Sequence, residues 1–182
     1  MAHQFLTSYL TDSLALFRVY KSLGERAMAQ VKDDQLHWAP DAESNSIAII
    51  VKHMAGNMRS RWSDFLTSDG EKPDRNRDSE FEAPPATRET LMQLWESGWS
   101  CLFAALEPLT DADLERTVYI RAEPHSVMQA INRQVAHYAY HVGQIVFLSK
   151  QLQSSQWTPL TIPRGQSVQF NARVASGEAS QR

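Results

Sequence analysis

Two histidines four residues apart, His137 and His141, occur in the segment HYAYHVGQ. In a helix this spacing places both imidazoles on one face, about one turn apart. Two imidazoles in this arrangement can bind one divalent cation together. The alternative is that each ring is a buried polar side chain with hydrogen bonds of its own. A zinc-protease motif is excluded, because that motif needs glutamate directly after the first histidine and Tyr138 stands there.

A third candidate ligand, His53, lies in the middle of another helical segment. Its neighbours Ile50 and Met54 are expected to face the core, so His53 lies at the edge of the buried stripe and within reach of the histidine pair. Three imidazoles around one ion satisfy one another, whereas a buried ring without a partner costs free energy. The alternative for His53 is a hydrogen bond to a backbone carbonyl or to Asn57. Spacing alone does not distinguish these two readings.

Four segments have the apolar spacing of amphipathic helices, and they must position these histidines. They run from about Phe5 to Val31, from Ile47 to Phe65, from about Thr87 to Leu106, and from about Ser126 to Leu152. The residues Arg116–Ile120 are β-prone and either pair locally or form an extended connection. We therefore predict an all-α fold, an up-down four-helix bundle with a long loop between helices two and three and an extended C-terminal segment.

The connections between these helices carry further predictions. The 69–85 loop is rich in charge, glycine and proline, and loops of this length are usually functional or disordered. Its alternating charges favour a solvated surface loop. The apolar residues of 157–171 are expected to pack back on the bundle. We predict one domain over residues 1–172 and a disordered tail over 173–182. Gly56 and Gly143 lie inside helices, for which close helix approach is the simplest explanation.

The composition describes an ordinary globular chain and excludes several classes. The 182 residues are 42% hydrophobic and carry a formal net charge of −3. No basic stripe supports a nucleic-acid partner, and no apolar run approaches membrane-spanning length. The N-terminus has no pattern of a signal peptide. Cys101 is the only cysteine and lies in the apolar stretch WSCLFAAL, so we expect it in the core of a cytoplasmic protein.

The chain resembles the DinB/YfiT-like superfamily of bacterial four-helix-bundle proteins, in a branch of unknown function. The resemblance extends from YKSLGERAMAQ through SNSIAIIVKHMAGNMRSRWSDFLTSDGEKPDRNRDSEFE and INRQVAHYAYHVGQIVFLSK to WTPLTIPRGQSVQFN. It implies a divalent metal ion held by one histidine of the second helix and a His-x-x-x-His pair of the fourth. These positions correspond to His53, His137 and His141. Some members are thiol transferases that use bacillithiol, mycothiol or glutathione, and others have no known activity.

A site of three neutral imidazoles leaves the ion its full charge and an open position, which suits catalysis. Such an ion lowers the pKa of bound water or of a thiol. Zinc and nickel are favoured, and iron and manganese are also compatible with three histidines. Arg61 is a candidate to receive an anionic group, although a salt bridge with Asp64 or the acidic loop would also explain it. The candidates for a position around the ion or in the substrate pocket are Asn57, Arg61, Asp64, Tyr138, Tyr140 and Gln144.

Three hypotheses follow for the function. The first is a metal-dependent transferase or hydrolase that activates a small thiol or water towards a small-molecule substrate. The second is a metal-binding, stress-related bundle protein without catalysis, and the third is a bundle whose histidines are structural. The fourth helix is apolar around most of its circumference, which favours a homodimer. This second apolar face comprises Ile131, Val135, Ala139, Val142 and Val146.

Overall fold

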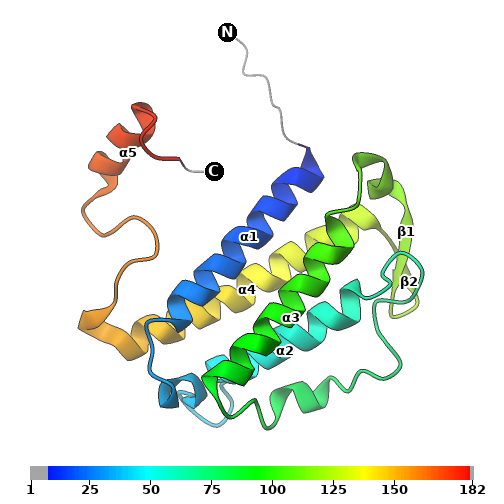
Figure 1. Ribbon diagram of the computed structural model, residues 1–182, viewed down its shortest axis with the longest axis horizontal. Helices are drawn as coiled ribbons and strands as arrows, with labels where there is room; N and C mark the ends of the chain where they lie inside the picture. The colour runs from blue at the N-terminus through cyan, green and yellow to red at the C-terminus, as the bar shows by residue number, and fades with distance from the viewer. Residues whose placement is uncertain (1–7, 181–182) are drawn as a thin grey trace.

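Four long helices begin after residues that cap them. They are α1 (Tyr9–Met28), α2 (Ile47–Trp62), α3 (Arg88–Leu106) and α4 (Val127–Gln153) (Figure 1). In each case a serine or threonine hydroxyl accepts a hydrogen bond from a backbone N–H of the first turn, which stabilises the helix start. The computed structural model describes residues 8–180, so the predicted start of the first helix at Phe5 lies outside the described residues.

The four helices surround one core. Both α1 and α2 pack against α3 and against α4. The rings of Phe17, Trp99 and Tyr138 are fully buried and contact one another at centroid distances of 5.7 to 6.4 Å. The apolar spacing of the first helix predicts Leu16 and Val19 in its buried stripe, but these side chains are 42% and 46% exposed. Phe17 takes the core position between them, since its larger apolar surface gains more from burial.

Helices α2 and α3 run in the same direction. A Cβ on Gly98 would lie 2.9 Å from the Cα of Ala55, and three residues further along both helices the Cys101 thiol lies 3.9 Å from the Met58 carbonyl oxygen. The alternating up-down order that we predicted is therefore wrong between helices two and three. A helix of 16 residues is about 24 Å long, and the connection over residues 63–87 is long enough to return the chain along it.

This crossover connection packs against α2 instead of extending into solvent. The ammonium group of Lys52 on α2 donates a hydrogen bond to the backbone carbonyl of Glu82 at 2.6 Å. The side chains of Arg75 and Glu80 are only 5% and 7% exposed. The prediction of a solvated surface loop is therefore wrong for the part that contains these residues. Buried opposite charges that pair with each other explain how so charged a segment packs against a helix.

The β-prone segment pairs locally, which is one of the two readings that the sequence left open. Strand β1 (Thr117–Ile120) and strand β2 (Glu123–Ser126) form an antiparallel hairpin. Its turn residues Arg121 and Ala122 have φ angles of 56° and 62°, a conformation that L-residues rarely adopt. The Asp69 carboxylate accepts hydrogen bonds from both backbone N–H groups, at 2.8 and 2.7 Å, and so stabilises the turn.

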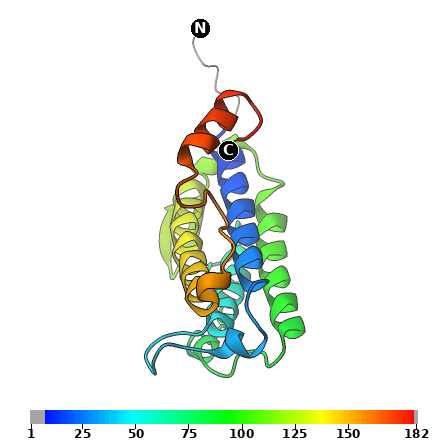
Figure 2. The same cartoon turned by 90° about the vertical axis from the view of Figure 1, so that its left-hand side faces the viewer.

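The C-terminal segment packs on the four helices only in its first part. Trp157 and Leu160 pack against the core, and Gln30 and Thr158 exchange two hydrogen bonds of 3.1 and 2.8 Å. Helix α5 (Ser167–Ala175) has no buried residue and stands apart from the long helices (Figures 1 and 2). It crosses residue 173, where we placed the start of the tail. The remaining short helices are η1 (Asp34–His37), η2 (Asp78–Phe81), η3 (Asp111–Glu115) and η4 (Ser154–Gln156).

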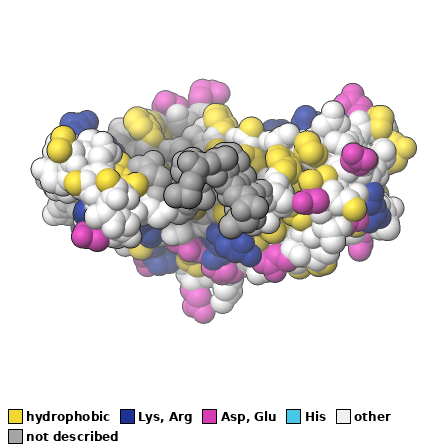
Figure 3. Space-filling view, turned by 90° about the horizontal axis from the view of Figure 1, so that it is seen from above, with side chains coloured by type: hydrophobic (Ala, Val, Ile, Leu, Met, Phe, Trp, Pro, Cys, Tyr) yellow, Lys and Arg dark blue, Asp and Glu magenta, His cyan; other side chains and the backbone are white. Residues whose placement is uncertain are grey.

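The surface shows no large area of one charge in the view of Figure 3, where acidic and basic side chains are interspersed with hydrophobic ones. No histidine is visible on that face. Within residues 8–180, no helix combines the length and the apolar composition that crossing a membrane requires.

Candidate metal centre

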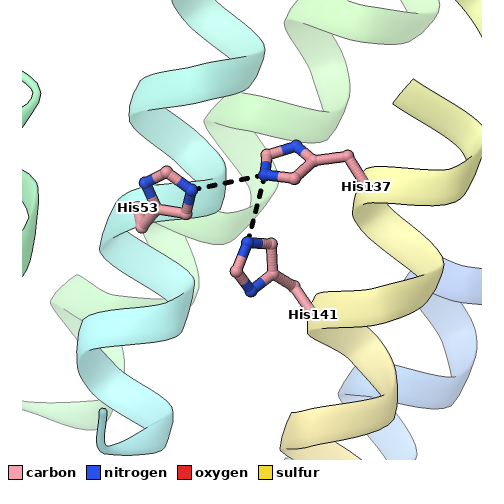
Figure 4. A group of neighbouring side chains, drawn as sticks. All are labelled: His53, His137 and His141. Atoms are coloured by element: carbon pink, nitrogen blue, oxygen red, sulfur yellow. Dashed lines mark hydrogen bonds between the residues drawn. The ribbon is translucent and has the colours of Figure 1, made fainter. Parts of the chain in front are cut away.

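The structure brings together the three histidines that the sequence singled out. His53 extends from α2, and His137 and His141 extend from α4 towards it (Figure 4). The Nε2 atom of His137 lies 3.4 Å from that of His53 and 3.1 Å from that of His141. The ligand atoms of all three rings lie within 4.8 Å of one another. Two ligands of a tetrahedral ion with metal–nitrogen bonds of 2.0–2.1 Å are about 3.3 Å apart, so the spacing suits one divalent ion.

The other ring nitrogen of each histidine has an oxygen partner. The Nδ1 atom lies 2.8 Å from Glu80 Oε2 in His53, 3.3 Å from Gln134 Oε1 in His137, and 2.9 Å from Gln144 Oε1 in His141. Because these oxygens accept, each Nδ1 carries a proton, and the Nε2 atom of a neutral ring then presents a lone pair. Three lone pairs directed at one another repel unless a cation lies between them. The hydrogen bonds therefore hold the rings in an orientation in which their Nε2 atoms could bind one metal ion.

Glu80 is a buried carboxylate. Burial raises its pKa, but hydrogen bonds from His53 and Arg75 outweigh burial and leave the pKa below its usual value. The Arg75 guanidinium contacts both carboxylate oxygens, at 2.8 and 3.0 Å. Gly56 gives this carboxylate its space, because a Cβ there would lie 2.5 Å from Glu80 Oε1. The next residue, Phe81, stacks on the His53 ring at a centroid distance of 4.8 Å.

The environment of the α4 histidines keeps them neutral. Burial, followed by the neighbouring rings of His141 and His53, lowers the pKa of His137 to about 3. Burial likewise lowers the pKa of His141 to about 4, although its hydrogen bond with Gln144 opposes the shift. Both rings are therefore unprotonated at neutral pH, as metal binding requires.

The other candidate residues have different surroundings. Asn57 and Arg61 line a cavity of about 480 Å³ beside His53 and His137, and Tyr140, which is 61% exposed, also lines it. The Arg61 guanidinium contacts Glu71 at 3.0 Å, so the salt bridge to the acidic loop is present. Tyr138 is fully buried in the core: its hydroxyl donates to Asn57 Oδ1 at 3.1 Å and accepts from the Trp62 indole N–H at 3.0 Å. Burial raises the pKa of Tyr138.

Two candidates of the sequence analysis lie at the margin of this group. Gln144 joins it through His141, and its amide nitrogen donates to the Tyr140 hydroxyl at 3.1 Å, which directs its oxygen to the ring. Asp64 lines a different cavity, beside α3, and has a positive φ of 47° two residues after the end of α2. It is not among the residues that line the cavity beside the histidines.

Sequence reasoning missed four residues of the centre: Arg75, Glu80, Phe81 and Gln134. Three of them lie on the crossover connection, whose charges we read as solvated. Two signals were present in the sequence. The connection is long enough to return along α2, and Gly56 stands one turn from His53. The space at Gly56 admits Glu80 rather than a second helix, and a Cβ on Gly143 would meet no atom within 4 Å. Close helix approach therefore explains neither glycine.

The fold and the site together define an all-α protein with a three-histidine cluster that can hold a metal ion. The chain belongs to the family described as proteins of unknown function (DUF1572), whose model matches residues 4–166. The matched region includes the three histidines and the crossover connection, and it ends before α5. No curated protein matches the chain.

Proposed function

We propose that His53, His137 and His141 bind one divalent metal ion, and that the protein is a metal-dependent transferase or hydrolase. The observation that carries the proposal is the convergence of three Nε2 atoms whose rings are each fixed through Nδ1. The proposal includes membership of the DinB/YfiT-like superfamily of four-helix bundles, with the crossover connection as the departure from simple up-down order. Zinc or nickel is the favoured ion, and iron and manganese suit the same ligands.

The cavity beside the histidines supports a catalytic site over a closed structural one. Structural zinc sites have four protein ligands, whereas catalytic sites keep a position for water or substrate. Among the described residues, the cluster contains three histidines and no fourth ligand. His53 and His137 both line the cavity of about 480 Å³, which is large enough for a small molecule next to their Nε2 atoms.

A divalent ion held by these residues would lower the pKa of water or of a thiol and so supply a nucleophile near neutral pH. The protein's own residues hold the ligands in place. Glu80 fixes the ring of His53, and Gln134 and Gln144 fix those of His137 and His141. Tyr140 is exposed and lines the same cavity, where a substrate can contact it. We propose a small electrophile as substrate, with a low-molecular-weight thiol or water as nucleophile.

The proposal extends to assembly and location. Val135, Ala139 and Val146 on α4 remain half-buried in the single chain, which leaves apolar area for a homodimer. Light scattering after size exclusion tests this, and a monomer mass at micromolar concentration would refute it. The single, half-buried cysteine suits the reducing cytoplasm that we expect for the protein.

Elemental analysis of the purified protein tests the metal site. We expect about one metal ion per chain in the wild type and a loss of most of it in His53→Ala and His137→Ala. His125→Ala is the matched control, because His125 lies on β2 with its Nδ1 near the backbone carbonyl of Glu123 and outside the cluster. Metal content that is the same in all three variants would contradict the site.

Turnover tests the second half of the proposal. Consumption of a low-molecular-weight thiol, or hydrolysis, against a panel of small electrophiles should require both the metal and the three histidines. A protein that holds its metal but is inactive with every thiol and with water would favour the non-catalytic, metal-binding alternative.

A further inference from the structure

The cavity beside the histidines is lined by an unusual number of arginines. Five of them reach it from four parts of the chain: Arg61 from α2, Arg75 and Arg77 from the crossover connection, Arg121 from the hairpin turn and Arg133 from α4. No aspartate or glutamate is among the described residues that line the same cavity. Segments far apart in sequence thus contribute positively charged side chains to one cavity.

Two carboxylates balance only part of this charge. Glu71 contacts the guanidinium groups of Arg61, Arg75 and Arg121 at 3.0, 3.2 and 3.3 Å. Glu80 pairs with Arg75 and is also the partner of His53. Five guanidinium groups thus face two carboxylates, and a bound divalent cation would add to the excess. A water-filled cavity with such an excess attracts anions strongly.

Two of the arginines have no acidic partner. Within the described part of the chain, no carboxylate forms an ion pair with Arg77 or Arg133. Arg77 is held over the ring of Phe81, with its guanidinium carbon 4.9 Å from the centroid. Phe81 in turn stacks on His53. Arg77 is therefore positioned next to the histidine cluster with its N–H groups available.

The inner wall of the cavity is built from fixed donors. The side chains of Arg61 and Arg75 are only 6% and 5% exposed, and Glu71 contacts both. The Nε atom of Arg61 is buried and has no hydrogen-bond partner in the described structure. A buried donor without a partner is costly, so the contacts of the Arg61 Nη1 atom with Glu71 and with the Gly70 carbonyl must hold this side chain in place. Donors that are already in place bind an anion with little further loss of conformational entropy.

From these contacts we infer that the substrate carries an oxyanion group with two negative charges, which the arginine-lined cavity binds. Guanidinium groups pair bidentately with phosphate and carboxylate oxygens, and several guanidinium groups around one cavity suit a dianion better than a monoanion. This inference deepens the proposed function and rests on it for the position of the reacting group. The dianion binds at the arginines while the rest of the molecule lies towards His53 and His137.

Calorimetric titration of the metal-free protein tests the inference. The probes are inorganic phosphate and succinate, at low ionic strength and mildly alkaline pH. We expect saturable binding of at least one of them. The double variant Arg77→Ala/Arg133→Ala should bind it about tenfold or more weakly, because each removed contact is a charge-assisted hydrogen bond. Both side chains are exposed, so the variant should fold. The better probe identifies a phosphoryl or a dicarboxylate substrate.

The matched control is Arg26→Ala, which removes an exposed arginine of α1 that does not line the cavity. It should leave anion binding unchanged. Lack of saturable binding for both probes, or equal weakening in Arg26→Ala, would overturn the inference. Metal analysis of the same proteins as purified, before the metal is removed for the titration, separates the two proposals. Stoichiometric metal without anion binding leaves the metal site intact and refutes the oxyanion, whereas anion binding in a wild type that holds no metal refutes the metal site alone.

Discussion

Replacing Glu80 by glutamine tests whether the partner of His53 prepares the cluster for a metal ion. Glu80 Oε2 lies 2.8 Å from His53 Nδ1, and as a carboxylate it can only accept from that ring. Glutamine keeps the shape but loses the charge, and it can also turn its NH₂ group towards the imidazole. Loss of such a partner weakens metal affinity by about 10- to 100-fold, or about 1.4–2.8 kcal/mol. We expect Glu80→Gln to weaken zinc binding at least about tenfold.

The control for Glu80→Gln must also remove a carboxylate partner of Arg75. Glu80 also pairs with the buried Arg75, and breaking a buried pair costs about 3–5 kcal/mol of stability. Glu71→Gln removes a carboxylate from the same Arg75 while touching none of the three histidines. Competition with a chromophoric chelator gives the zinc affinity, and urea unfolding of the metal-free proteins gives the stability. Equal affinity loss in both variants, or none in Glu80→Gln, would refute the orienting role of Glu80.

Three further predictions follow from the same contacts. Gly56→Ala places a Cβ 2.5 Å from Glu80 Oε1, so we expect about tenfold weaker metal binding in the chelator assay. The Cβ of Gly143→Ala meets no atom within 4 Å, so this variant should raise the free energy of unfolding by about 0.5–1 kcal/mol. The folded-state pKa values of about 3 for His137 and about 4 for His141 lie below the value of about 6.5 for an unfolded histidine. Below pH 6.5 the unfolded chain therefore takes up protons that the folded chain does not. The free energy of unfolding of the metal-free protein should fall by on the order of 2 kcal/mol between pH 7 and pH 5, after allowance for the partial exposure of His137. Urea unfolding measures this change, and its pH dependence should be flatter in a variant with both histidines replaced by glutamine. Free zinc at 100 times its dissociation constant should stabilise the wild type by about 2.7 kcal/mol in the same assay and leave His137→Ala unchanged.

The helices and the helix faces that carry the three histidines were accessible from the sequence because their determinants are local, whereas the convergence of the histidines was predicted from the family resemblance. Ser46, Thr87 and Ser126 mark helix starts where we expected them, within one residue. The spacing of His137 and His141 fixes their common face as soon as the segment is helical. The burial of His53 at the edge of its apolar stripe also follows from helical periodicity. These inferences needed no knowledge of how the helices are connected.

The contacts that sequence reasoning missed depend on the direction in which the chain runs between α2 and α3. Once residues 63–87 return along α2, they lie over the face that carries His53, and Glu80 and Phe81 come into contact with it. Read as a solvated loop, the same charges predict none of these contacts. The pairing of Glu71 and Glu80 with arginines from three segments is a product of the tertiary fold. Spacing along the chain contains no signal for it, except that Gly56 marks a place where another group approaches α2 closely.

The most direct test of the central claim is X-ray absorption at the metal edge of the zinc-loaded protein. Three Nε2 ligands predict the multiple-scattering signature of three imidazoles with metal–nitrogen distances of about 2.0–2.1 Å. One imidazole should disappear from the signal in His53→Ala, and His125→Ala should match the wild type. A spectrum that contains only two imidazoles, or one that His53→Ala leaves unchanged, would contradict the three-histidine centre.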